Sequence, residues 1–287
     1  AFGDPDIELE RRLVDTLEDL IKSHREGSIE QLSILLDLPG LPELELSQTP
    51  VDPISLYKAR MSLISLLGQS LAIPLKTLLS KTKAQCSLKW PNGQAARKLR
   101  SQAWRLLVMG GDLDVRRDAL EAVQGNSMTL ARAGLDALKP VDSKERDLAM
   151  SIFYNRWKDS PVILDTWFSL EASTPREDGL ERIKELLKHP RFDLMAPNSL
   201  RAVLGGLAAN TKVFHCFDGS GYMFMAEQIV EIDNRNPITA ARFAKVFSRW
   251  QSYIDINRSA MHVALSSLSK SKLSSNTSEI VEQILSE

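Results

Sequence analysis

The sequence predicts an all-α protein, and two observations support this. Its 287 residues include only 14 Gly and 13 Pro, and the long stretches between them are rich in Leu, Ala, Glu, Lys, Arg and Ser. Apolar residues in these stretches recur at steps of three and four, the spacing that places side chains on one face of an α-helix. The alternating pattern of a strand is almost absent.

The first half of the chain contains a series of such amphipathic segments. Leu9, Leu13 and Leu17 mark the first, and Asp52-Pro53 provides a cap and a first-turn proline for a second that runs to Pro74. Further helices are expected over residues 94–109, 113–124, 127–138 and 144–158. Their expected capping residues are Asn126 for the third of these and Asp142 or Ser143 for the fourth.

The second half repeats this pattern. Helix starts are expected at Ser160-Pro161, Asn198 and Asn236-Pro237, and His189-Pro190 closes another helix. We expect Gly205-Gly206 to end a helix in a left-handed turn. Phe243, Phe247, Trp250 and Ile254 are spaced as one helical stripe facing a core, and two last helices are expected over 257–268 and 276–285.

About a dozen helices of this length, joined by short loops, are typical of armadillo or HEAT repeats. Because no strict period is visible, we expect an irregular superhelical stack of antiparallel helices; a compact irregular bundle is the alternative. We treat 1–287 as a single α-helical domain. The repeat array covers 52–287, and the helices of 1–50 are assigned to it by continuity.

Composition excludes several functions. The 36 basic and 37 acidic residues give a formal net charge of -1, so no global field favours nucleic acid as a partner. No apolar run approaches the roughly 18 residues that span a membrane. Cys86 and Cys216 are too few for a disulfide framework, which favours a reducing compartment, the cytoplasm or an organelle interior.

The sequence carries no self-sufficient active site. Its four histidines are His24, His189, His215 and His262, and none lies in the H-E-x-x-H pattern that sets two imidazoles around zinc. In His215-Cys216 the adjacent side chains point apart, whereas a nucleophile and its base must share a hydrogen bond. Gly219-Ser220-Gly221 lacks the Lys-Ser or Lys-Thr of a phosphate-binding loop. We therefore expect no catalytic residue and no metal ligand in this chain.

Several ordered motifs resemble the C-terminal region of the bacterial-type aminopeptidase N family. The strongest are Asn198 to Leu207, Phe214-His215-Cys216-Phe217-Asp218-Gly219-Ser220-Gly221-Tyr222, and Asn234-Arg235-Asn236-Pro237 followed by Ala240-Ala241-Arg242. Upstream, the matching motifs are Asn126-Ser127-Met128-Thr129, Phe153-Tyr154 with Trp157, Asp165-Thr166-Trp167-Phe168, and Leu187 to Phe192. The resemblance covers roughly residues 50–287.

The resemblance implies a modular, zinc-dependent enzyme of which this chain is the last, armadillo-like or HEAT-like domain. In that family the helical domain closes over the catalytic domain, walls off an internal chamber and contributes surface beyond the scissile bond. The zinc would belong to the catalytic domain, so the expected partners are that domain of the same polypeptide and peptide substrates.

The resemblance also implies two substrate-binding residues, Arg201 and Arg242. A guanidinium facing the chamber can pair bidentately with the carboxylate that ends a peptide. The alternative is a structural role, in which these arginines pair with acids such as Asp218, Glu227 or Glu231.

An alternative function from a different class is a free-standing helical adaptor that binds a protein through its concave face. The chain begins at Ala1 rather than Met, and we expect it to be a processed chain or a part of a longer one. If it is an excised domain, its bare docking face favours self-association.

Overall fold

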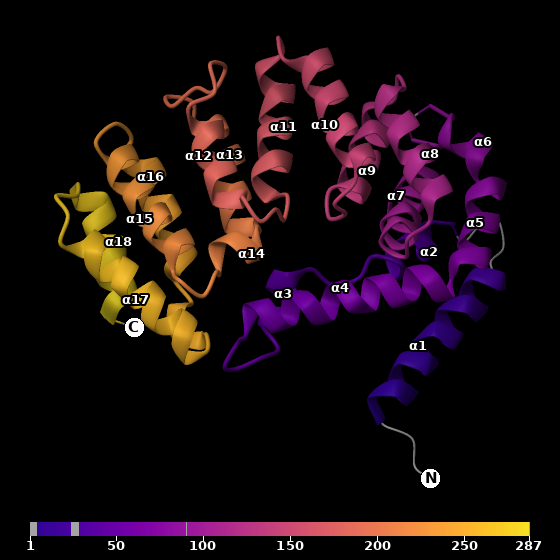
Figure 1. The fold of residues 1–287 in the computed structure, drawn as a ribbon, viewed down its shortest axis with the longest axis horizontal. Helices are drawn as coiled ribbons and strands as arrows, with labels where there is room; N and C mark the ends of the chain where they lie inside the picture. The colour runs from indigo at the N-terminus through magenta and orange to yellow at the C-terminus, as the bar shows by residue number, and fades with distance from the viewer. Residues whose placement is uncertain (1–4, 24–28, 90, 287) are drawn as a thin grey trace. The chain divides into compact units, whose positions relative to one another are not determined.

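The computed structural model describes residues 5–23, 29–89 and 91–286. This described part is built from helices and contains no strand (Figure 1). Its one β contact is an isolated parallel bridge between Val51 and Tyr253. The prediction of an all-α helical repeat stack is confirmed.

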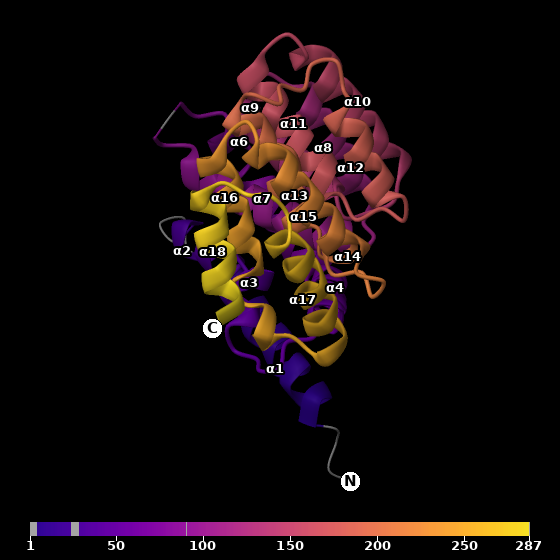
Figure 2. The ribbon, with the colours of Figure 1, turned by 90° about the vertical axis from the view of Figure 1, so that its left-hand side faces the viewer.

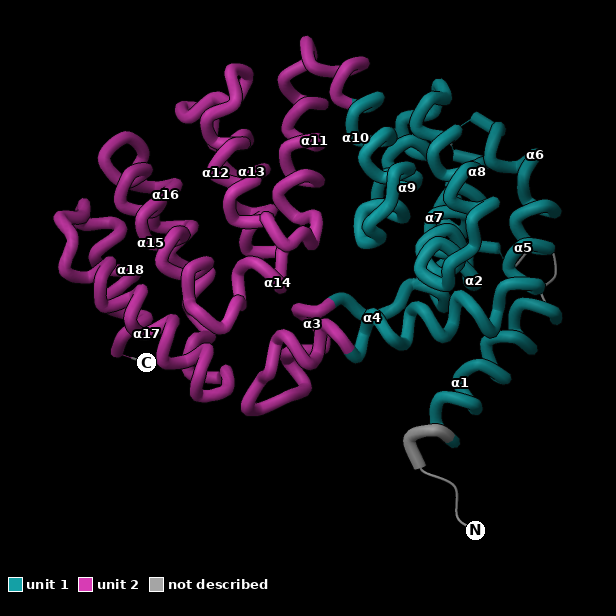
Figure 3. Tube along the Cα trace, viewed as in Figure 1, with its two compact units in different colours: residues 1–40, 59–153 teal, residues 41–58, 154–287 magenta. Residues whose placement is uncertain are grey.

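The chain divides into two compact units, which we describe separately (Figure 3). Unit 1 comprises residues 1–40 and 59–153, and unit 2 comprises residues 41–58 and 154–287. Two helices, α4 (Pro53–Ser70) and α10 (Lys144–Trp157), contribute residues to both units.

Unit 1 is organised around α7 (Gln94–Met109), whose apolar face is buried along its length. Its other helices are α1 (Pro5–Lys22), α2 (Ile29–Leu35), α5 (Ala72–Lys81), α6 (Lys83–Cys86), α8 (Leu113–Gln124) and α9 (Met128–Leu138). Helix α7 packs against α2, α5, α6, α8 and α9, and α8 packs against α9. Fully buried leucines such as Leu99, Leu107 and Leu135 fill the space between these helices.

Unit 2 is a run of paired helices. Its helices are α3 (Leu41–Glu45), α11 (Pro161–Ser173), α12 (Gly179–Leu187), α13 (Pro197–Ala209), α14 (Thr211–Phe214), α15 (Ser220–Asp233), α16 (Pro237–Ala244), α17 (Asp255–Ser269) and α18 (Ser275–Ser286). Helix α13 packs on α11 and α12, while α15 packs on α16 and α17. Figure 2 shows α16 beside α18, and the two helices are in contact. Each pair buries a face that its neighbour leaves open, as in helical repeats.

No single described helix is long and apolar enough to cross a membrane. Helices α4 and α5, which are bent relative to each other, meet the length and composition criteria only when they are counted as one segment.

Most expected helix starts and ends are confirmed to within two residues, because the capping chemistry is local. Ser55 N donates to Asp52 Oδ1 at 2.9 Å, Arg146 N to Ser143 Oγ at 3.2 Å, and Thr239 N to Asn236 Oδ1 at 3.1 Å. Each side chain thereby accepts from a backbone N–H that has no partner in the first helical turn.

Two capping predictions are wrong. The cap of α9 is Ser127, whose Oγ accepts from Leu130 N at 3.4 Å, and not Asn126. Asn198 lies inside α13, because Pro197 takes the first helical position and Ala196 precedes it. Proline at that position needs no N–H partner and sets the helical φ angle in advance.

The prediction of a left-handed turn at Gly205-Gly206 is also wrong. Both residues lie within α13, and among the described residues only Gly111 and Gly219 have positive φ. Gly206 is instead a point of close packing between helices. A Cβ built there would lie 2.6 Å from the Cβ of Ala172 on α11.

The expected aromatic stripe from Phe243 to Ile254 does not lie on one helix. Helix α16 ends at Ala244, and two short 3-10 helices follow, Lys245–Phe247 and Trp250–Ser252. Val51 N donates to Ser252 O at 2.8 Å, and Ile254 N donates to Val51 O at 2.9 Å. This extended pairing takes the chain out of the helix, although Phe243 and Phe247 are buried as predicted.

Candidate functional site

Arg201 lies on the exposed side of the second turn of α13, next to the buried Ala202. Its Nη1 donates to Asn198 Oδ1 at 3.2 Å, a neutral acceptor one turn earlier on the same helix. One turn later, Gly205 leaves the space beside the arginine open: the nearest atom to a Cβ built there is Arg201 Cγ, at 3.7 Å. The guanidinium is therefore held near the helix surface and faces outward.

Arg242 lies in the last turn of α16, a helix that begins at the Asn236 cap. It is exposed and borders an open groove of about 390 Å³ between α16 and α18. The groove is lined by Ile238, Ala241, Arg242, Lys245, Asn276, Glu279 and Ile280. Two cations, Arg242 and Lys245, outnumber the single acid, Glu279, and two isoleucines add apolar surface, so the groove suits an anionic group attached to an apolar one.

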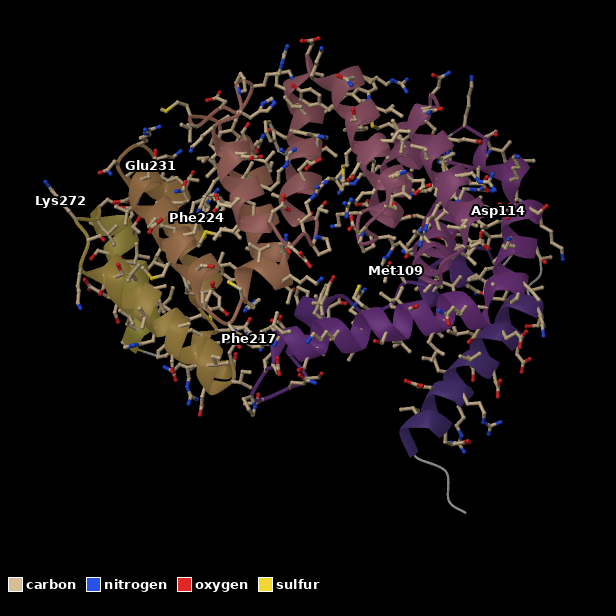
Figure 4. All side chains as sticks on the ribbon, viewed as in Figure 1. Met109, Asp114, Phe217, Phe224, Glu231 and Lys272 are labelled. Carbon is tan, nitrogen blue, oxygen red and sulfur yellow. The ribbon has the colours of Figure 1, made fainter. Side chains whose placement is uncertain are left out.

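Within the described residues, neither Arg201 nor Arg242 forms an ion pair with a carboxylate. Of the acids named as alternative partners, Glu231 instead lies 3.4 Å from Arg235, and the Asp218 carboxylate accepts from Ser220 N at 2.9 Å. Figure 4 labels Glu231 toward the C-terminal end of α15. The two arginines lie on helices with different main packing partners, α11 for α13, and α15 and α18 for α16.

His215 and Cys216 do not form a nucleophile and base pair. His215 Nδ1 lies 2.6 Å from Tyr222 Oη, whereas Cys216 Sγ lies 3.3 Å from Ser220 Oγ and accepts from Gly221 N at 3.4 Å. Burial lowers the pKa of His215 to about 4. Burial, with the nearby Asp218 carboxylate, raises the pKa of the Cys216 thiol. Near neutral pH the pair is therefore an uncharged imidazole and a thiol.

The motif around His215 instead joins three helices. Asn257, on α17, donates from Nδ2 to Tyr222 Oη at 2.9 Å and to the His215 carbonyl at 3.3 Å. Gly219, with φ of 73°, makes the left-handed turn that leads into α15. Phe217, labelled in Figure 4, lies in the same turn and is exposed. These contacts fix α14, α15 and α17 to one another.

Asp233, at the end of α15, is a structural residue that the sequence analysis did not identify. Its carboxylate accepts hydrogen bonds from Ser274 N and Ser274 Oγ, both at 2.6 Å, and from Thr277 Oγ1. It thereby caps α18 from a different helix and helps to set the wall of the groove beside Arg242.

Most of the aromatic residues of the upstream motifs pack together. Tyr154, Trp167, Phe168, His189 and Phe192 form one cluster with ring centroids 4.7 to 5.7 Å apart. Tyr154 Oη lies 3.2 Å from His189 Nε2, and Arg191 N donates to His189 Nδ1 at 3.2 Å. Both ring nitrogens of His189 are thus engaged in holding the segment after α12.

The described part of the chain brings together no group of three or more His, Cys, Asp or Glu side chains that could hold a metal ion. His24 lies outside the described residues. We therefore derive no zinc chemistry from this chain's own side chains.

Comparison with protein families gives a match along nearly the whole sequence. A family model described as a domain of unknown function (DUF3458_C) with ARM repeats matches residues 2–286. The match includes the segments that carry Arg201, Arg242 and the His215 motif.

Individual relatives agree with this match. Aminopeptidase N from Caulobacter vibrioides is 31% identical over 261 residues, and aminopeptidase N from Escherichia coli is 30% identical over 239 residues. These alignments cover 88% and 82% of this chain, but only 30% and 27% of the two relatives. The crystal structure of Legionella pneumophila aminopeptidase A in complex with aspartic acid has a TM-score of 0.86 at 26% identity, and the match covers 95% of this chain and 33% of that one.

Proposed function

Because the chain belongs to the DUF3458_C family of ARM-repeat domains and matches segments of aminopeptidase N, we propose that it is the non-catalytic C-terminal helical domain of a zinc aminopeptidase. The observation that carries this proposal is the asymmetry of the alignments, which cover most of this chain but less than a third of each aminopeptidase N relative. The parent enzyme removes N-terminal amino acids from peptides, and its zinc is held by residues of the catalytic domain.

In this proposal the helical stack caps the active-site chamber and limits which substrates reach the zinc. Its partners are the catalytic domain of the same polypeptide and peptide substrates. A reducing compartment, the cytoplasm or an organelle interior, suits the two free cysteines, Cys86 and Cys216.

Arg201 and Arg242 are proposed to bind the C-terminal side of the peptide. Two features support this role: both guanidiniums are exposed, and neither is neutralised by a carboxylate of the described residues. A peptide carboxylate would supply the missing counter-charge through two parallel hydrogen bonds.

The direct test is an activity assay on the isolated 287-residue chain. It should hydrolyse no aminoacyl-anilide, with or without added zinc. Metal-dependent turnover that follows the chain through purification would overturn the proposal. An aminopeptidase with an intact catalytic domain, assayed in parallel, confirms that the conditions support the reaction.

The isolated chain is also proposed to self-associate through apolar surface that the parent enzyme covers. Large apolar side chains are exposed in both units, among them Ile73, Leu113, Val162 and Ile238. Sedimentation velocity at several concentrations should show a concentration-dependent increase in size, and a chain that stays monomeric throughout would contradict this.

A further inference from the structure

A groove of about 500 Å³ lies in unit 1, whereas both candidate arginines belong to unit 2. Its two walls come from α5–α6 and from α8, and α7 lies between them. Lys76 Nζ on α5 lies 2.9 Å from Asp112 Oδ2 at the start of α8 and ties one end of the walls together. Ligand sites of small molecules have volumes of roughly 300 to 1,000 Å³, so the groove is large enough for one.

The two walls carry opposite charges. Asp114, Asp118 and Glu121 follow one another at steps of four and three, which places all three carboxylates on one face of α8 (Asp114 is labelled in Figure 4). Lys76 and Lys83 lie on the opposite wall. Because Asp114 is already 3.8 Å from Lys76, the acids that lack an ion pair in the described part of the chain are Asp118 and Glu121.

Arg100, between the walls, is a buried cation without a counter-ion. It is only 8% exposed, and its Nη2 donates to Leu79 O at 2.8 Å and its Nε to Cys86 Sγ at 3.4 Å. Its guanidinium carbon also lies 5.4 Å from the ring centroid of Trp104. No described carboxylate lies within ion-pair distance of it. An unpaired buried charge is costly, so this arginine favours an anionic ligand.

Trp104 supplies an independent second observation. It lines the same groove, is 2% exposed, and its Nε1 has no hydrogen-bond acceptor in the described structure. Buried polar atoms are normally hydrogen-bonded, so this buried indole N–H lacks an acceptor in a residue that lines the groove.

We propose that this groove binds a small zwitterion, an α-amino acid or a short peptide. Its carboxylate pairs with Arg100 and Lys83, and its ammonium group pairs with Asp118 and Glu121. A ligand of net charge zero matches a groove whose basic and acidic side chains are equal in number. The site does not include Arg201 or Arg242, which belong to unit 2. This proposal can therefore be tested independently of the proposed function.

The test is calorimetric titration of the chain with L-alanyl-L-alanine, with L-alanine and with two blocked forms. N-acetyl-L-alanyl-L-alanine lacks the ammonium group, and L-alanyl-L-alaninamide lacks the carboxylate. Each blocked form should bind at least about tenfold more weakly than the free dipeptide, because each loses one charged contact. The comparison of L-alanine with the dipeptide shows which length of zwitterion spans the two walls.

Exposed residues of the two walls provide variants that should fold. Lys83→Gln and Glu121→Gln should each weaken dipeptide binding about tenfold, while the controls Lys144→Gln and Glu177→Gln, outside the groove, should leave it unchanged. Arg201→Ala and Arg242→Ala should also leave it unchanged. Equal binding of free and blocked dipeptides, no binding at all, or binding that survives both groove substitutions would overturn the proposal.

Discussion

His215 and Tyr222 share a 2.6 Å hydrogen bond between Nδ1 and Oη, inside a contact that joins α14, α15 and α17. Asn257 donates to the same phenol oxygen, which leaves the phenol hydrogen to bond His215 Nδ1. Nδ1 can accept this bond only while the imidazole is neutral. The contact therefore makes the packing of three helices dependent on the protonation state of one side chain.

The free energy of unfolding should fall as the pH drops from about 6.5 to about 4. Burial lowers the pKa of folded His215 to about 4, while the unfolded chain has a pKa near 6.5, so the unfolded state binds more protons in this window. The full loss is about 3 kcal/mol, and above about pH 6.5 no loss remains. Urea unfolding over a pH series measures it.

His215→Gln should remove most of this dependence of the unfolding free energy on pH. It should also lower the unfolding free energy by an amount that does not change with pH. His189 has a pKa lowered by burial and by Arg182 and Arg191, so it contributes a further loss of the same sign. If the unfolding free energy of His215→Gln still falls with pH as steeply as that of the unchanged protein, other groups cause the acid sensitivity.

Alanine substitutions at the two adjacent glycines of α13 should have opposite effects on the stability of the protein. Gly206→Ala places a methyl group against Ala172 of α11 and should destabilise the protein by about 1 to 3 kcal/mol. Gly205→Ala meets only Arg201 Cγ at 3.7 Å and should stabilise the helix by up to about 1 kcal/mol. Urea midpoints of the two variants test this, and similar effects of both would contradict the packing of α11 on α13.

Asp233→Asn should destabilise unit 2 by about 2 kcal/mol, because an amide cannot accept all the hydrogen bonds that the carboxylate accepts from Ser274 and Thr277. Burial alone would raise the pKa of Asp233, but these hydrogen bonds outweigh burial and lower it. The stabilisation is thus present above about pH 4 and is lost as the pH falls through the lowered pKa.

Hydrogen exchange can locate this effect. Amides of α18 should lose protection in Asp233→Asn, while those of α11 should keep theirs. The neighbouring Asn234 is exposed, and Asn234→Ala should change stability by no more than about 0.5 kcal/mol. Equal effects at the two positions would show that Asp233 does not cap α18.

The sequence alone predicts those helix boundaries that depend on residues close together in the chain. Asp52 and Asn236 cap helices through residues three positions away, so their roles were visible in the sequence. Asp233 and Asn257 act on partners 41 and 35 residues away, and nothing near them in the chain indicates these contacts. The break near Tyr253 depends in the same way on Val51, about 200 residues earlier.

The candidate site shows the same limit. Arg201 and Arg242 were identified by a resemblance, and the structure adds that both are exposed without a carboxylate partner in its described part. The groove of unit 1 could not be predicted from the sequence, because its charged side chains come from four helices. Only the i, i+4, i+7 spacing of Asp114, Asp118 and Glu121 was visible in the sequence, and that pattern is also typical of an ordinary solvated helix face.

If the proposed function holds, Arg201→Ala and Arg242→Ala, made in the proposed parent aminopeptidase, should raise KM for di- and tripeptides about tenfold and leave kcat nearly unchanged. The reason is that the proposed contact is to the terminal carboxylate, away from the scissile bond, and would be equally strong in the ground and transition states. Amides of the same peptides lack that carboxylate, so their KM should change little. Arg242→Lys keeps the charge but loses the bidentate geometry and should give an intermediate KM.

Arg235→Ala is the matched control, because Arg235 is an exposed arginine of unit 2 that already pairs with Glu231. It should leave KM unchanged for peptides and amides alike. If Arg201→Ala and Arg242→Ala raise KM equally for both substrate classes, the arginines do not recognise the carboxylate. A KM effect confined to free peptides would instead require a cationic partner at the peptide's C-terminal side, because only the carboxylate distinguishes the two classes.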